Sequence, residues 1–159
     1  MTEIIPPFLN LKNLTYLCSN CIYTLFFLIF IPKSKFSNIM KIEGTKSTPS
    51  VVIEQGFIEI KGRSIPEDSH DFFSPIITEI QTFAEALADK TEIRFRLEYI
   101  NSGSKKYIST ILGILNDMYL QGKDISILWH YDYDDESMLE LGNDFRSLLE
   151  MPFKVIEVK

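Results

Sequence analysis

The sequence predicts an α/β protein with a mixed, mostly parallel sheet that begins with an antiparallel hairpin, in the order ββαβαβαβ. Short runs of β-branched and aromatic residues alternate with segments whose apolar residues recur every three or four positions. This alternation requires right-handed crossovers between parallel strands. One central strand is polar at every second position, so we expect the helices mainly on one face of the sheet.

The composition is that of a globular domain and excludes several functional classes. Of the 159 residues, 45% are hydrophobic and 24% are charged. The formal net charge of −6 disfavours non-specific binding to nucleic-acid phosphates. The chain has no G-x-G-x-x-G, no P-loop motif and only 2 histidines, which argues against dinucleotide, P-loop and histidine-rich metal sites.

Residues 1–39 differ from the rest of the chain, and we expect them to be an apolar extension outside the fold. Their apolar run, residues 21–31, is shorter than the roughly 20 residues of a bilayer span. The segment also lacks a small-residue cleavage site, so it is a poor signal peptide. A membrane anchor, an incomplete signal and an upstream extension remain as alternatives. The last is favoured because residues 40–159 look like a complete domain.

The two cysteines lie in this extension and carry little chemistry. Cys18 and Cys21 form a C-x-x-C, but one pair cannot complete a four-ligand zinc site. Residues 40–159 contain no cysteine, which suits a cytoplasmic protein without disulfides.

The first predicted elements of the domain are a hairpin and a helix. Residues 50–54 and 57–61 read as strands joined at Gln55 and Gly56, a typical hairpin turn. Asp68 or Ser69 then caps a helix that carries Pro75 near its first turns, where proline is tolerated. Its apolar stripe comprises Phe73, Ile76, Ile77, Ile80, Phe83, Ala84 and Leu87.

Residues 91–100 form a strictly alternating strand. The apolar side carries Ile93, Phe95, Leu97 and Tyr99, and the charged side carries Glu92, Arg94, Arg96 and Glu98. We expect the charged side to face water. Its arginines and Glu98 form either a cross-strand charge ladder or a patch that faces a partner.

Strand and helix then alternate to the end of the chain. Residues 101–104 are predicted to form a polar turn before a helix that ends at Gly122. In the strand over 125–131, Trp129 and Tyr131 should point inward and His130 outward. An acidic loop (132–136), a third amphipathic helix and a last strand (153–158) complete the domain. The inward residues of these two helices are Ile108, Ile111, Leu112, Leu115 and Tyr119, then Met138, Leu141, Phe145, Leu148 and Leu149.

Ligands of open α/β sheets bind at the carboxyl ends of the strands, where this chain has loops at 62–67, 101–104 and 132–136. The second loop places two hydroxyls at a helix start, where the helix dipole favours an anion. Lys105 and Lys106 follow directly, an unfavourable position unless a negative charge is sometimes near. A phosphate on Ser102 or Ser104 would supply that charge. Alternatively, a serine only caps the helix and both lysines are solvated.

The other candidate sites are weaker. Asp132, Asp134, Asp135 and Glu136 lack the glycine and closing glutamate of an EF-hand, which favours a solvated loop without a metal or other cofactor. His70 and His130 lie sixty residues apart without a nucleophile pattern, which disfavours a Ser-His-Asp triad. A metal-dependent enzyme using the acidic loop and His130, and a membrane-tethered adaptor, stay as alternatives.

Five stretches of the chain together resemble the SiaC family of regulatory phosphoproteins, which are similar to anti-sigma-factor antagonists of the SpoIIAA (STAS) type. They are TKSTP at 45–49, GFIEIKGRSIPE at 56–67, LEYINSGSK at 97–105, GKDISILWHY at 122–131 and PFKVIE at 152–157. The resemblance covers residues 40–159 and implies a STAS-like fold.

The resemblance also implies a signalling switch rather than an enzyme. Family members are phosphorylated by a partner Ser/Thr kinase and dephosphorylated by a partner metal-dependent phosphatase. The unmodified form binds and activates a diguanylate cyclase, which links the family to c-di-GMP signalling and biofilm control.

The family's acceptor follows the asparagine of a motif like L-x-Y-x-N-T-S-S, which falls here on Ser102 after Asn101. Serine replaces threonine at this position and Gly103 replaces a serine, which leaves Ser104 as an alternative acceptor. We therefore expect a cytoplasmic phosphoswitch in which Asn101 and Gly103 shape the turn and Lys105 lies near the modified group. The further residues expected on the partner surface are Tyr99, Ser104, Arg63 and Glu67.

Overall fold

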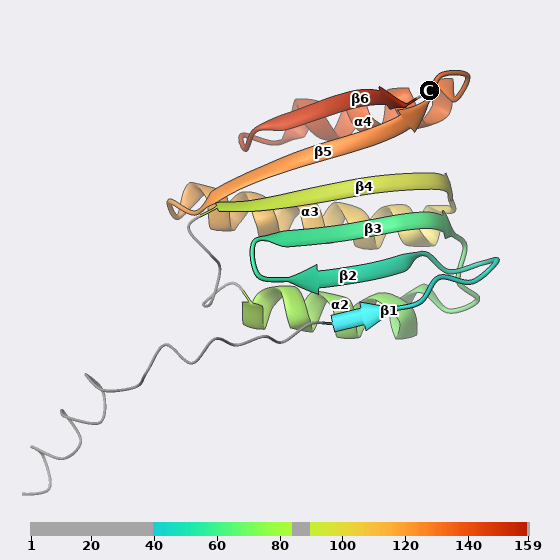
Figure 1. Ribbon diagram of the computed structural model, residues 1–159, viewed down its shortest axis with the longest axis horizontal. Coiled ribbons are helices and arrows are strands. Elements are labelled where there is room, and N and C mark those ends of the chain that lie inside the picture. Colours follow the sequence, from blue (N-terminus) through green and yellow to red (C-terminus); the bar gives the residue numbers. More distant parts are fainter. Residues whose placement is uncertain (1–39, 84–89, 159) are drawn as a thin grey trace, which may run out of the picture. The chain divides into compact units, whose positions relative to one another are not determined.

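The computed structural model describes residues 40–83 and 90–158, which form one six-stranded sheet and three helices (Figure 1). The strands are β1 (Met40–Ile42), β2 (Ser50–Glu54), β3 (Phe57–Ser64), β4 (Lys90–Ile100), β5 (Asp124–Asp132) and β6 (Phe153–Val158). The helices are α2 (Ser69–Phe83), α3 (Ser102–Leu120) and α4 (Glu136–Leu148). The predictions for residues 1–39, Cys18 and Cys21 included, and for the side chains of Phe83, Ala84 and Leu87 lie outside the described residues.

The strands lie in the sheet in the order in which they occur along the chain. The pairs β1–β2 and β2–β3 are antiparallel, and β3–β4, β4–β5 and β5–β6 are parallel. The predicted mixed, mostly parallel sheet with an N-terminal hairpin is thus confirmed. The hairpin turns at Gly56, whose φ of 79° lies in the left-handed region that favours glycine.

One strand was not predicted. The three-residue β1 pairs with β2 only, so the element order is βββαβαβαβ. Its sequence, MKI, is too short to show an alternating pattern, and the strand exists because β2 offers an unpaired edge.

The three helices lie on one side of the sheet, as expected (Figure 1). We call this side the covered face, and its core combines strand residues such as Phe95 and Trp129 with helix residues such as Phe73 and Ile111. The opposite side, which carries Glu59, Arg94 and His130, is covered by no helix of the described residues, and we call it the open face.

Trp129 of β5 positions α4 on the covered face. The fully buried indole donates a hydrogen bond from Nε1 to the carbonyl oxygen of Met138, at 2.9 Å. A Cβ on Gly142 would lie 2.5 Å from Cδ1 of the indole, so this helix position requires glycine. The predicted inward orientation of Trp129 is confirmed, and Tyr131 is partly buried against the same core.

Two residues predicted to face inward are exposed instead. Tyr99 is 51% exposed because the β3–β4 register shifts between Gly62 and Arg63. Glu98 is the extra residue of this irregularity, which reverses the alternation after Leu97. Leu148, at the end of α4, is 75% exposed, whereas its neighbour Leu149 packs against the core.

Aspartate side chains cap the N-termini of α2 and α4 by accepting hydrogen bonds from backbone N–H groups. Asp68 caps α2, with Oδ1 accepting from the backbone N of His70 at 2.7 Å and of Asp71 at 3.0 Å. These bonds, that from Asp71 first, hold the pKa of the Asp68 carboxyl below its usual value. Asp135 caps α4 through Met138 N at 3.0 Å, so the acidic loop is shorter than the predicted 132–136.

Candidate functional site

The candidate site lies where β4 ends and α3 begins. Asn101 is the N-cap of α3, and its side-chain oxygen accepts a hydrogen bond from Ser104 N at 2.7 Å. Lys105 N donates to Asn101 O at 2.9 Å, the first backbone bond of the helix. The predicted four-residue turn over 101–104 was therefore wrong, because α3 already begins at Ser102. The alternative of a serine cap was also wrong, because Asn101 is the cap.

The two candidate serines have opposite surroundings. Ser102 is the first residue of α3 and is exposed. Ser104 is 0% exposed, and its Oγ has no hydrogen-bond partner among the residues that the structure describes. Only the Ser102 hydroxyl is open to a macromolecular reagent in this conformation.

The start of α3 is held by the neighbouring elements. Asn101 N donates to Ser64 O of β3 at 3.1 Å, which ties the ends of the two strands together. A Cβ on Gly103 would lie 2.6 Å from Oγ of Ser69, the first residue of α2. The helix starts of α2 and α3 thus lie side by side, and the glycine leaves room for the Ser69 hydroxyl.

The other predicted partner residues are only partly brought together. The Arg63 guanidinium lies over the Tyr99 ring, 5.4 Å from its centroid, and both side chains are exposed next to the end of β4. Glu67 is exposed in the loop that follows β3. Among the described residues, no hydrogen bond or ion pair joins Glu67 to Ser102 or its neighbours.

Ser102 borders an open groove of about 580 Å³ between α3 and α4. We call it the Ser102 groove, and it is lined by Ser102, Lys105, Lys106, Ser109, Asp144, Phe145, Ser147 and Leu148. Both lysines are exposed and share the groove with the hydroxyl. The exposed Leu148 gives the opposite wall an apolar surface.

The α4 wall of this groove was missed in the sequence. Phe145 is buried in the core as predicted and also lines the groove, whereas Leu148, predicted to face inward, is exposed. Adjacent positions of a helix can both face the core, as Ile111 and Leu112 of α3 do, so the pattern gave no signal that Leu148 would be exposed.

The alternative sites do not assemble in the described part of the chain. Within it, no three His, Cys, Asp or Glu side chains are grouped as a metal site requires. His70 of α2 lies 3.1 Å from the Tyr107 hydroxyl and 3.0 Å from that of Ser74, whereas His130 belongs to β5 on the open face. Of the helices that the structure describes, none has the length and hydropathy to cross a membrane.

The fold and the site define a small α/β protein with a surface hydroxyl at a helix start, where a charge-changing modification acts strongly on its surroundings. Residues 42–158 match the family model described as "SiaC family regulatory phosphoprotein". The chain belongs to the SiaC family, as its sequence resemblance indicated.

Relatives and solved structures agree with this assignment. An uncharacterised protein of Pseudomonas aeruginosa (strain UCBPP-PA14) is 32% identical over 118 residues, which cover 73% of this chain and 94% of the relative. The structure of SiaC of Pseudomonas aeruginosa matches with a TM-score of 0.71 and 30% identity, over 76% of this chain and 99% of that one.

A third match comes from a complex. A chain in the crystal structure of the diguanylate cyclase SiaD with its activator SiaC, from Pseudomonas aeruginosa, matches with a TM-score of 0.68 and 32% identity. The match covers 75% of this chain and 99% of that one. The matched relatives are thus covered almost completely.

Proposed function

We propose that this protein is a non-enzymatic signalling switch controlled by phosphorylation of Ser102. A partner Ser/Thr kinase adds the phosphate, a partner metal-dependent phosphatase removes it, and the unmodified form binds and activates a diguanylate cyclase in the cytoplasm. The carrying observation is the exposed Ser102 hydroxyl at the start of α3, beside two exposed lysines. The activator role of SiaC in the SiaD complex supports the cyclase as the target.

Burial favours Ser102 over Ser104 as the acceptor. A kinase must bring its ATP γ-phosphate to the attacking oxygen, and Ser104 Oγ is enclosed. Reaching it would require the first turn of α3 to open, with loss of the bond between Ser104 N and Asn101. The Ser102 hydroxyl requires no such change.

A phosphate on Ser102 would be stabilised locally. It adds about 1.5 to 2 negative charges at the positive end of the α3 dipole. Lys105 and Lys106 follow at the i+3 and i+4 positions, whose side chains lie next to that of residue i on a helix. The modification therefore changes the charge of the Ser102 groove without refolding the domain.

The switch acts on partner docking. A surface that binds the target in the unmodified state would have to accommodate a hydrated dianion in the modified state. An opposing free energy of about 1–3 kcal/mol changes the affinity by 5- to 150-fold, which suffices for control of a signalling partner. The groove walls and the stacked pair Arg63–Tyr99 are the surfaces that such docking would use.

Intact-mass measurement after incubation with the cognate kinase and ATP tests the acceptor. The wild type and Ser104→Ala should each gain one phosphate, and Ser102→Ala should gain none. A full phosphate signal in Ser102→Ala would remove Ser102 from the proposal. All three unmodified proteins should stimulate c-di-GMP synthesis by the cyclase. After treatment with the kinase and ATP, this stimulation should fall for the wild type and Ser104→Ala and stay unchanged for Ser102→Ala.

A further inference from the structure

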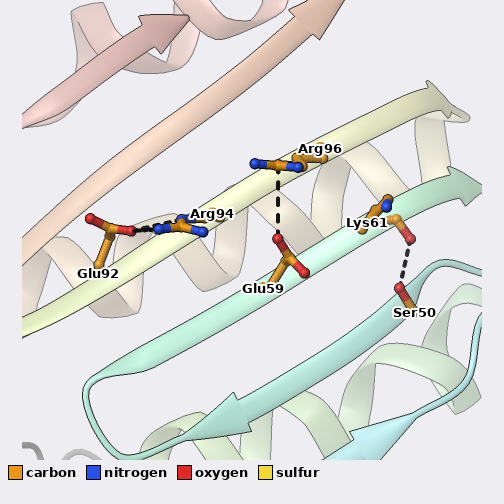
Figure 2. A network of polar contacts seen from close by, with 6 residues as sticks. All are labelled: Ser50, Glu59, Lys61, Glu92, Arg94 and Arg96. Atoms are coloured by element: carbon orange, nitrogen blue, oxygen red, sulfur yellow. Dashed lines mark hydrogen bonds and ion pairs between the residues drawn. The ribbon is translucent and has the colours of Figure 1, made fainter. Parts of the chain in front are cut away.

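A row of basic side chains crosses the open face of the sheet. Lys61 of β3, Arg96 of β4 and His130 of β5 are register partners, and we call them the basic row. Neighbouring strands lie about 4.8 Å apart, so the three side chains emerge next to one another. Figure 2 shows Lys61 and Arg96 on their adjoining strands. Lys61 and Arg96 are like charges directly opposite each other, which destabilises a sheet, so this arrangement favours a nearby negative charge.

The protein's own carboxylates neutralise the basic row incompletely. Arg96 Nε lies 3.8 Å from Glu59 Oε1, beyond hydrogen-bond distance. Two residues earlier, Arg94 differs, because its Nε donates to Glu92 Oε1 at 2.7 Å (Figure 2). Its guanidinium also covers the Phe57 ring, 5.0 Å from the centroid. The two arginines of β4 therefore differ: Arg94 is hydrogen-bonded to a carboxylate, whereas Arg96 is not.

The ring of His130 is also unsatisfied. Both of its ring nitrogens and Arg96 Nε are buried and have no hydrogen-bond partner within the described residues. Buried polar atoms without partners are rare in folded proteins and indicate a missing water, ion or ligand. In a neutral imidazole one ring nitrogen donates and the other accepts. The two donors, Arg96 Nε and one ring nitrogen of His130, belong to register partners on neighbouring strands, which indicates one missing acceptor rather than separate defects.

A small cavity lies over these groups. It has a volume of about 210 Å³ and is lined by Lys61, Arg96, Leu97, Glu98, His130, Tyr131, Asp132 and Val158. This is less than the roughly 300–1,000 Å³ of sites for drug-sized ligands. Glu98 and Asp132 are exposed at the rim of the cavity and repel further negative charge. This repulsion also favours a small anion over a large, highly charged one.

We infer that this cavity binds a small free oxyanion, a phosphate or a carboxylate, with Arg96 as its principal donor. A guanidinium presents parallel N–H groups that match either oxyanion, and Lys61 and His130 lie on either side of it to complete the shell. The site lies on the face of the sheet opposite to the helices, so it is a ligand site separate from Ser102 and does not rest on the phosphorylation proposal.

The pKa of His130 agrees with this electrostatic setting. It is lowered first by burial and then by the positive charges of Arg96 and Arg94, against the smaller opposing effect of Glu59 and Glu92. A bound oxyanion would counter the two arginines and return the pKa toward its usual value.

Binding is tested on the full chain with inorganic phosphate and with malonate, each added up to about 10 mM, a range that detects millimolar dissociation constants. Sodium chloride at equal ionic strength is the reference. The wild type should show a saturable rise in melting temperature and saturable shifts of the His130 imidazole resonances with at least one of the two probes. The probe that acts identifies the anion as a phosphate or a carboxylate.

Arg96→Gln is the test variant and Arg94→Gln its matched control, because both remove one guanidinium from the same face of β4. We expect the affinity to fall at least about tenfold in Arg96→Gln and to stay within twofold of wild type in Arg94→Gln. Equal losses in both variants would mean non-specific attraction, and no saturable response in the wild type would mean no site. Either result overturns the inference.

The wild-type titration tests for the site even if Arg96→Gln fails to fold. In that case Lys61→Gln, at an exposed position, replaces it and should weaken binding by several-fold. An unchanged affinity in that variant would exclude the basic row as the binding site.

Discussion

The two faces of the sheet follow different physical rules. On the covered face, Phe95 and Trp129 are fully buried, and the fit of α4 depends on a single missing Cβ at Gly142. On the open face, Arg94 and Arg96 of the same strand stay half-exposed and are held by ion pairs. The covered face thus fixes the fold, and the open face carries charged side chains that remain partly solvated. Both candidate sites lie outside the packed layer, one at the start of a helix and one on the open face.

The largest effect is expected on the covered face. Trp129→Ala removes the indole that contacts Phe95 and Phe145 and accounts for the bond to Met138 O. We expect a loss of about 3–5 kcal/mol in the free energy of unfolding, measured by urea denaturation. Leu148→Ala on α4 is the control, since this exposed side chain should contribute less than about 0.5 kcal/mol. Similar losses in both variants would contradict the assignment of the core.

A smaller effect separates stability from function at the start of α3. Asn101→Ala removes the cap and leaves Ser104 N without its partner, so we expect a loss of about 1 kcal/mol in the free energy of unfolding. Ser102→Ala removes an exposed hydroxyl and should leave stability within about 0.5 kcal/mol of the wild type. Urea denaturation distinguishes the two. A larger loss for Ser102→Ala than for Asn101→Ala would mean that Ser102 is a structural residue.

The covered face was the more predictable of the two faces, because burial of one side of an element produces a periodic pattern in its sequence. The alternation of Ile93, Phe95 and Leu97 located β4, and the stripe through Ile108 and Ile111 located α3. The errors came from pairing and capping. Tyr99 faces outward because the register of β4 with β3 shifts just before it. The helix α3 begins earlier than predicted because the Asn101 side chain accepts from Ser104 N and caps it.

The sites were less predictable than the fold. Ser102 was identified as a candidate acceptor through the family resemblance and the lysines that follow it. The α4 wall of the Ser102 groove depends on how two helices pack, which local pattern does not contain. Similarly, the alternation of β4 predicts that its charged side faces solvent. It does not predict that Lys61, Arg96 and His130 lie in one row, because that depends on the register of three strands.

The ion pairs of the open face should contribute little to stability, and unequally. A double-mutant cycle on Arg94 and Glu92 should give a coupling of about 0.2–1 kcal/mol, because the pair is hydrogen-bonded but partly solvated. A cycle on Arg96 and Glu59 should give a coupling nearer to zero, since the atoms are 3.8 Å apart. Both are obtained from urea denaturation of single and double glutamine variants. A stronger coupling for Arg96 than for Arg94 would contradict the incomplete pairing of the basic row.

The smallest expected effect is a change of stability with pH. The pKa of His130 is lowered in the folded protein, mainly by burial and then by Arg96 and Arg94, whereas in the unfolded chain it lies near 6.5. Between the two pKa values the unfolded chain binds more protons, so stability should rise with pH across this window. The contribution is therefore present above about pH 6.5 and is lost as the pH falls through the folded-state pKa. Urea denaturation in phosphate-free buffer should show this slope in the wild type.

Two variants assign that slope. His130→Gln should remove it, and Arg96→Gln should reduce it, because losing one of the two repelling guanidiniums brings the folded-state pKa of His130 closer to its usual value. An imidazole titration followed by NMR measures the same pKa directly. If Arg96→Gln left that pKa unchanged, burial and Arg94 would account for the shift, and Arg96 would have no electrostatic influence on the histidine beside it.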